Sequence, residues 1–354
     1  MGQRSDETTI PWLMKGRVPA LDGLRGLAIL LVLVGHTVAF QTESPHFAWI
    51  RLGEWGVDLF FAISGFIITL LLLRELHHSG TIALSNFYMR RALRILPPYL
   101  AFLLFVFVGE WIIGPHLESY ERFGLLTMTL NLFPIKSHYA GHIWSLSLEE
   151  QFYLLWPGIL WCLGPRRGLY AAIVVILIVP FMRYIVNNYI PGLLVFNSTP
   201  TRLDGIMTGC IVALLATGMA GPRLQPVGSI GSLLALLVGA TFFLFRGFCE
   251  QHTDSYLYYH SGSALYMAAI LWIVISTEGG WVSWFFRQPW ITTLGLLSYS
   301  LYLWQQPFLY RHSVGWWNLF PWNIGVIFTI ATISYYCLER PLLRWRNKLR
   351  SQVE

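Results

Sequence analysis

The sequence predicts an all-α fold, a polytopic bundle of membrane-spanning helices with about ten full spans and one partial or re-entrant segment. Of the 354 residues, 55% are hydrophobic and only 12% are charged, whereas soluble domains usually carry about 25% charged residues. The apolar runs recur along the whole chain and are continuous rather than alternating, which favours helices over a β-barrel. The composition therefore indicates a membrane protein rather than a soluble globule.

The full spans follow one another with short loops between them. We expect them at 24–41, 55–73, 95–114, 142–163, 169–189, 203–218, 228–245, 258–276, 292–310 and 320–338. Residues 122–134 are apolar but shorter than the roughly 20 residues that cross a bilayer. If they crossed fully, Arg166 and Arg167 would fall outside, against the tendency of basic loops to stay in the cytoplasm. We therefore expect this segment not to cross.

Three regions are predicted: a cytoplasmic N-terminal tail (1–17), a membrane domain (18–345) and a cytoplasmic basic tail (346–354). The net charge of +6 sits in short loops and tails between the spans, which is a signal of topology and not of nucleic-acid binding. No CxxC pair and no metal-ligand grouping occurs, so no metal site is expected. The four cysteines are widely spaced, at Cys162, Cys210, Cys249 and Cys337.

The first span carries Arg25 at its start and His36 deep inside. At ~100° per residue, the eleven-residue step returns to nearly the same helix face, displaced by ~16 Å. Ionisable groups in a membrane span are expensive and mark a functional site by default. A neutral buried imidazole can act as a general base. The alternative is a histidine that only hydrogen-bonds to a neighbouring helix.

The cytoplasmic stretch FYMRRALRILP carries Arg90, Arg91 and Arg94 at spacings that a helix would gather into one basic cluster. Arginines grip phosphates through charge-assisted, often bidentate, hydrogen bonds. The cluster is therefore a candidate phosphate site. The alternative is an anchor to the anionic lipid heads of the inner leaflet.

The block HIWSLSLEEQFYLLWP opens a later span. Helical spacing places His142, Ser145 and Glu149 on one face, with Ser147 and Glu150 offset from it. Two adjacent acids at the head of a span are costly unless they face a polar interior or water. We expect one of them to orient and charge-stabilise a histidine. The alternative is a structural carboxylate that ties two helices together.

A further block, RLDGIMTG, carries Arg202 and Asp204 at the outer end of a span. We expect this Arg–Asp pair to be structural, and we expect the same of Asp58 in the second span. Gly205 and Gly209 match the small-residue pattern of helix packing. Arg183 has no evident partner in the sequence.

Seven blocks together resemble membrane acyltransferase family 3, in order and in spacing, over about residues 18–345. They read LDGLRGLAILLVLVGH, GVDLFFAISGFIIT, FYMRRALRILPPYL, HIWSLSLEEQFYLLWP, TRLDGIMTG, LGLLSYSLYLWQQP and YYCLERPLLRW. The family's basic residue, ten-residue gap and histidine correspond to Arg25 and His36. Its RxxR motif corresponds to Arg91 and Arg94, and its WSLSxE block ends at Glu149.

The resemblance implies an integral protein of the bacterial inner membrane with both termini in the cytoplasm. It implies transfer of an acyl group, usually acetyl, from cytoplasmic acyl-CoA to a hydroxyl of a cell-surface or lipid-linked carbohydrate. The chain resembles the stand-alone branch without a C-terminal esterase-like domain, which uses direct transfer or a separate acyl-accepting partner protein. In one departure, Gln305 stands where many relatives have histidine.

These expectations combine into one mechanism. Acyl-CoA phosphates would bind Arg91 and Arg94, aided by Arg25 and Arg90. His36 would act as general base or as an acyl relay, held by Glu149, while either Ser145 or Ser147 donates to the developing oxyanion. The rival function is a transporter or flippase for a lipid-linked glycan. The acceptor, the acyl group, the choice between base and covalent relay, and the oligomeric state stay open.

Overall fold

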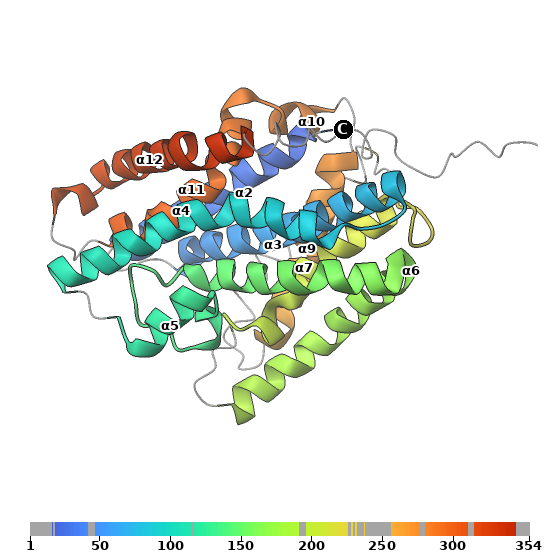
Figure 1. The fold of residues 1–354 in the computed structure, drawn as a ribbon, viewed down its shortest axis with the longest axis horizontal. Coiled ribbons are helices and arrows are strands. Elements are labelled where there is room, and N and C mark those ends of the chain that lie inside the picture. The colour runs from blue at the N-terminus through green and yellow to red at the C-terminus, as the bar shows by residue number, and fades with distance from the viewer. Residues whose placement is uncertain are drawn as a thin grey trace, which may run out of the picture.

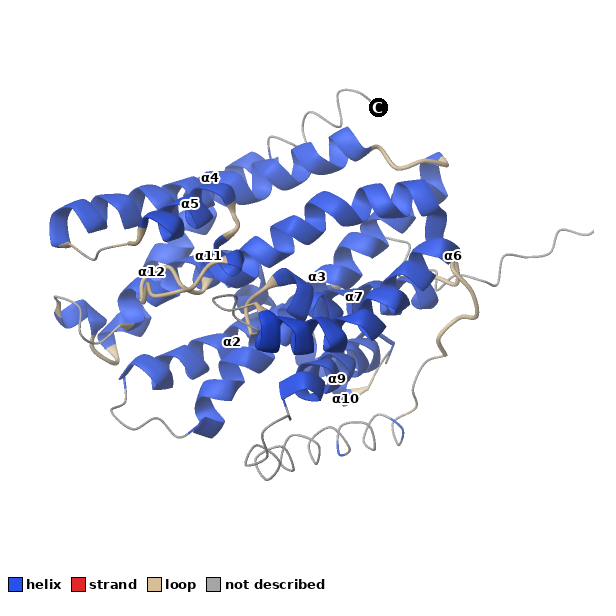
Figure 2. Cartoon of the chain, turned by 90° about the horizontal axis from the view of Figure 1, so that it is seen from below, coloured by secondary structure: helices blue, strands red, loops and turns tan. Residues whose placement is uncertain are grey.

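The fold is known here from a computed structural model. It describes residues 16, 18–41, 47–114, 117–190, 196–225, 228, 231, 237, 256–276, 280–310 and 315–344. Every regular element in these ranges is helical, which confirms the predicted all-α class (Figures 1 and 2). The helices long and apolar enough to cross a membrane are Pro19–Gln41, Leu52–Ser79, Leu84–Ile112, Ile143–Tyr189, Tyr259–Ser276 and Trp322–Arg344.

The helices follow the apolar runs of the sequence. In chain order they are α2 (Pro19–Gln41), α3 (Phe47–Ser79), α4 (Leu84–Ile113), α5 (Ser119–Thr127), η1 (Leu130–Leu132), α6 (Ile143–Tyr189), α7 (Thr199–Ala216), α9 (Tyr256–Ser276), α10 (Trp281–Phe286), α11 (Pro289–Leu309), η2 (Trp316–Asn318), α12 (Trp322–Ser334) and the π-helical turn η3 (Tyr335–Glu339).

Each predicted span that falls on described residues lies on one of these helices. One element, the 47-residue α6, holds two of the predicted spans, 142–163 and 169–189. Gly164 separates them with a positive φ of 72°, a conformation that glycine adopts without steric cost. The predicted span 228–245 lies almost entirely outside the described residues.

The segment 122–134 does not cross the bundle, as expected. It contains α5, of nine residues, and the three-residue η1. Nine helical residues extend only ~14 Å, about half of a hydrocarbon core. Figure 1 shows α4 ending and α6 beginning at the same end of the molecule, so the intervening residues stay at that end.

Glycine lets the central helices touch backbone to backbone. A Cβ atom at Gly295 of α11 would overlap the carbonyl oxygen of Asp22 in α2. A Cβ atom at Gly209 of α7 would overlap the carbonyl of Ala62 in α3, which confirms the packing role predicted for Gly209. Such small-residue contacts are typical of helix association in membranes. They fix the height of α2 and α3 against their neighbours.

Two buried ion pairs tie α7 to its surroundings. Arg202 pairs with Asp58 of α3, and Arg183 pairs with Asp204, each at 2.5 Å with side chains at most 4% exposed. The structural role expected for these residues is thus supported, but the partners differ from the sequence expectation. Residues two apart on a helix point in different directions, so Arg202 cannot face Asp204. The partner of Asp204 is instead Arg183, for which the sequence showed no partner.

Candidate active site

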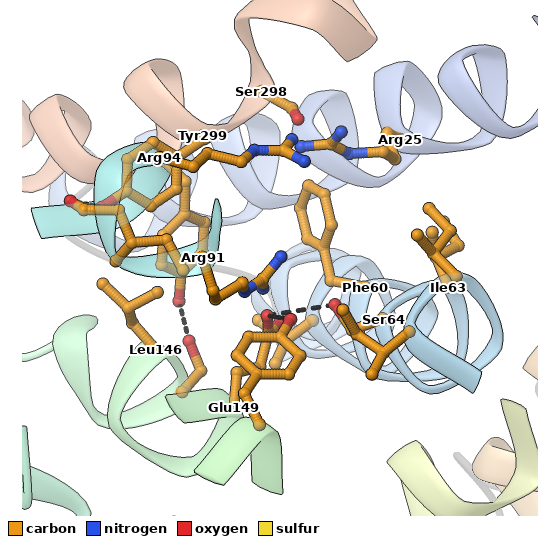
Figure 3. Close-up of a pocket in the computed structure, with 17 residues that line it drawn as sticks. Arg25, Phe60, Ile63, Ser64, Arg91, Arg94, Leu146, Glu149, Ser298 and Tyr299 are labelled. Carbon is orange, nitrogen blue, oxygen red and sulfur yellow. Dashed lines mark hydrogen bonds between the residues drawn. The ribbon is translucent and has the colours of Figure 1, made fainter. Parts of the chain in front are cut away.

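A pocket lies among α2, α3, α4, α6 and α11, and encloses about 780 Å³ counting the part open at its mouth. Each helix contributes polar side chains to a largely apolar wall, an arrangement typical of small-molecule sites. The polar lining consists of Arg25, Ser64, Arg91, Arg94, Ser145, Glu149, Tyr153, Ser298, Tyr299 and Tyr302 (Figure 3).

Three arginines converge in this pocket. Arg94 lies within electrostatic range of Arg25 and Arg91, and Figure 3 shows the guanidinium groups of Arg94 and Arg25 side by side. None of the ion pairs found in the described ranges includes any of the three. Like charges held together away from bulk water repel strongly. The cluster therefore favours a bound anion.

Arg91 is held by an aromatic ring. Its guanidinium carbon lies 3.5 Å from the ring centroid of Tyr153, a cation–π contact that leaves the edge of the guanidinium free to donate. The Nε atom of Arg91 is buried and has no hydrogen-bond partner within the described chain. Buried donors are nearly always satisfied, so this atom is suited to a ligand oxygen.

Glu149 closes the opposite wall of the pocket. Its carboxylate accepts a hydrogen bond from Ser64 of α3 at 3.0 Å and another from the hydroxyl of Tyr153. The first bond links α6 to α3, as the structural alternative proposed. The carboxylate also lies within electrostatic range of Arg91, so it limits the positive charge of the pocket.

The expected contact between Glu149 and His36 is wrong. His36 is half-buried, and its Nδ1 atom lies 3.2 Å from Oε1 of Gln305 on α11. The reason is depth: His142 hydrogen-bonds to Gln306, next to Gln305, whereas Glu149 lies seven residues, ~10 Å, further along α6. Gln305, and not an acid, holds the imidazole.

Arg90 does not join the other arginines, contrary to expectation. Its guanidinium pairs with Glu75 of α3 at 3.1 Å, and its side chain is 41% exposed. Successive residues on a helix point ~100° apart, so Arg90 turns outward when Arg91 faces the pocket. Arg90 is not among the lining residues.

The two candidate serines differ in position. Ser145 lines the pocket, and its hydroxyl lies 2.5 Å from the hydroxyl of Tyr302. Ser147 is fully buried and donates to the carbonyl of Ile143 in its own helix, at 3.0 Å. Only Ser145 is therefore placed where a substrate oxygen can reach it.

Sequence reasoning missed an acidic residue near the pocket, Glu339. Glu339 accepts a hydrogen bond from Ser300 and lies within electrostatic range of Arg94 and Arg25. An acid inside the last apolar run was the available signal. It belongs to the π-helical turn η3, and such turns occur frequently at functional sites.

No group of three or more metal-ligating side chains occurs among the residues described in the structure. The charged groups that can hold a ligand are the arginines. Because guanidinium groups bind phosphate in a bidentate manner, the pocket has the chemistry to hold a phosphorylated molecule.

The fold and the pocket are those of an integral membrane protein with a cluster of arginines between its helices. The profile of the family described as "Acyltransferase domain" matches residues 18–338. The chain belongs to this acyltransferase family.

The chain is similar to curated relatives that are named as O-acetyltransferases. It is 28% identical to the peptidoglycan O-acetyltransferase OatA of Listeria monocytogenes, over 92% of this chain and 56% of the relative. It is 29% identical to a putative O-acetyltransferase of Staphylococcus aureus strain COL, over 93% and 59%. It is 28% identical to the O-acetyltransferase OatA of S. aureus strain NCTC 8325, over 92% of this chain and 57% of the relative. The chain thus spans less than two thirds of each of these relatives. No solved structure matches it significantly.

Proposed function

We propose that the chain is a membrane O-acyltransferase that moves an acyl group, acetyl in particular, from cytoplasmic acyl-CoA to a hydroxyl of a cell-surface or lipid-linked carbohydrate. The observation that carries the proposal is the convergence of Arg25, Arg91 and Arg94 without an ion-pairing acid in the described chain. Glu149 and Glu339 offset part of this charge at a distance, and the phosphates of CoA would supply anions in direct contact with the guanidinium groups.

The donor's path follows α2. Arg25 lines the pocket, and His36 lies eleven residues along the same helix, ~16 Å further. Tyr302 forms the edge of the pocket on α11, and Gln305, the partner of His36, lies three residues beyond it on the same face. The extended arm of CoA would run from the pocket along the surface of these two helices and bring the thioester to the imidazole.

The transfer needs one proton acceptor. The free ring nitrogen of His36 takes the proton of the acceptor hydroxyl while the hydroxyl oxygen attacks the thioester carbon. A C–O bond forms, the C–S bond breaks, and the imidazolium returns the proton to the CoA thiolate. In the covalent variant, the same nitrogen first accepts the acyl group and then passes it to the hydroxyl, or to a separate partner protein. Ser145 lines the pocket and would donate to substrate oxygen in place of its bond to the carbonyl of His142.

Labelled acetyl-CoA offered to membranes with a panel of glycans tests this function. Peptidoglycan fragments come first in the panel, because the Listeria relative is named for that polymer. We expect His36→Ala to lower label transfer by about 10²- to 10⁴-fold, the usual contribution of a general base. His77→Ala removes an exposed histidine at the end of α3 and serves as the control.

Equal transfer by the wild type and His36→Ala would refute the role of His36. Movement of a lipid-linked glycan across the bilayer in the absence of any acyl-CoA, with no label transferred, would instead favour a flippase.

A further inference from the structure

Among the described residues, the side-chain amide of Gln305 contacts a partner through its oxygen but not through its nitrogen. The side chain is completely buried in α11, and its Oε1 atom contacts Nδ1 of His36 at 3.2 Å. Its Nε2 atom is also buried, yet it has no hydrogen-bond partner within the described chain. A buried donor left unsatisfied costs about 1–3 kcal/mol. Such a cost at a position beside the candidate base calls for a ligand.

The neighbouring glutamine shows what a structural amide looks like at this place. Oε1 of Gln306 accepts from the backbone N–H of His142 at 2.7 Å and also contacts its Nδ1 atom at 2.6 Å. Nε2 of His142 faces the carbonyl of Leu303 at 3.0 Å. That carbonyl has no helical donor because Pro307, four residues later, has no N–H, and Nε2 can donate to it when His142 carries both ring protons. Gln306 and His142 thus complete the end of α11.

The side chain of Gln305 makes no hydrogen bond to the backbone within the described chain. Its contact with His36 sets the tautomer of the imidazole. A carboxamide oxygen only accepts hydrogen bonds, so the contact places the proton of a neutral imidazole on Nδ1. The lone pair then lies on Nε2, the nitrogen turned away from Gln305. Nε2 is therefore the atom that takes the proton of the acceptor hydroxyl.

We propose that Gln305 is a second catalytic residue, whose Nε2–H group donates to the carbonyl oxygen of the acyl group as it becomes an oxyanion. The inference rests on the proposed function, because it requires the thioester to reach His36. Oε1 and Nε2 share one amide carbon, so a carbonyl oxygen bound to Nε2 lies next to the imidazole. One rigid group thereby orients the base and stabilises the charge that the attack creates.

Two variants separate the two functions of the amide. Gln305→Met keeps the length of the side chain and removes both the acceptor and the donor. Gln305→Glu keeps an acceptor for Nδ1 of His36 and, as the carboxylate, replaces the amide donor with a second acceptor, which also adds a negative charge beside the imidazole. We expect both to lower kcat for acyl transfer by about 10²- to 10³-fold, the usual effect of losing an oxyanion donor. The KM for acyl-CoA should stay within about twofold, because the arginines that hold the phosphates are untouched.

Trp304→Phe is the matched control. Nε1 of Trp304 is also a buried donor of α11 without a hydrogen-bond partner in the described part of the chain. Its ring packs against Phe102 and Phe105 rather than against His36. We expect wild-type kcat and KM for this variant. A purely structural role for buried donors of α11 would lower activity in Trp304→Phe as well.

The outcomes separate this inference from the proposed function. An inactive His36→Ala together with wild-type kcat in Gln305→Glu would overturn the donor role of Gln305 and leave the acyltransferase proposal intact. Wild-type transfer by His36→Ala would overturn both. A rise in KM for acyl-CoA with kcat unchanged in both Gln305 variants would show that the amide binds the donor uniformly, and would also overturn the inference.

Discussion

At the scale of single residues, the environment of each arginine decides what it does. Arg90 and Arg94 lie one turn apart on α4, yet Arg90 pairs with Glu75 while Arg94 faces Arg25 in the pocket. An exposed ion pair contributes little, typically 0–1 kcal/mol. An arginine in a cluster that no acid contacts directly contributes mainly when an anion binds.

This difference predicts different effects on acyl-CoA affinity for alanine substitutions of Arg94 and Arg90. We expect Arg94→Ala to weaken acyl-CoA binding by about 10- to 100-fold, the loss of one charge-assisted contact. Arg90→Ala should leave the affinity unchanged. Binding of labelled acyl-CoA to the purified protein measures both. Unchanged affinity in Arg94→Ala, with normal expression, would return this arginine to the role of a lipid anchor.

The sequence predicted which side chains carry charge at the site better than it predicted their partners. Arg25, Arg91 and Arg94 line one pocket, on the side of the bundle where we expected them, whereas Glu149 lines this pocket instead of contacting His36. The contact of His36 with Gln305 joins residues 269 positions apart. Such a contact depends on how far two helices slide past each other, and that displacement is not encoded in the spacing along either helix.

At the scale of elements, the sliding of α11 against α2 is fixed by glycine. Gly295 touches the backbone of Asp22, and Gly26 touches that of Ile291. With this packing, Ser298 lines the same pocket as Arg25, and Gln305 contacts His36. A side chain inserted here would separate the two helices, and thereby the two halves of the site.

Gly295→Ala is therefore expected to destabilise the protein by about 1–3 kcal/mol, the usual cost of overpacking. It should also lower acyl transfer, because the contact between His36 and Gln305 is displaced. Thermal unfolding in detergent and the transfer rate measure these effects. Gly325→Ala on α12 is the control, since a Cβ there meets no atom within 4 Å. Equal melting temperatures for the two variants would contradict this role of Gly295.

Most of the spans were predictable because they are continuous apolar runs, but several of their ends were not. The predicted spans 203–218 and 292–310 lie on α7 and α11, which are not among the helices long and apolar enough to cross a membrane. The predicted span 95–114 begins well inside α4, which starts at Leu84. The first turns of α4 carry arginines and read as a loop in hydropathy, although the helix continues through them. The 122–134 segment was correctly placed, because charge in the later loops restricts the topology.

At the scale of the whole molecule, the bundle separates two chemistries along one helix. The arginine cluster lies toward the beginning of α2 and His36 toward its end. Both pairs of neighbouring basic residues, Arg90–Arg91 and Arg166–Arg167, lie where the positive-inside tendency predicts cytoplasm. In the proposed orientation, CoA binds from inside while the acceptor meets His36 from outside.

The central claim is that one chain passes an acyl group from a donor on one side of the membrane to an acceptor on the other. Proteoliposomes with labelled acetyl-CoA on the side of Arg94 and a glycan acceptor only on the opposite side test it directly. We predict label on the glycan for the wild type and for Arg90→Ala, and at least about 10²-fold less for His36→Ala. Transfer that occurs only when donor and acceptor share one compartment would contradict the claim.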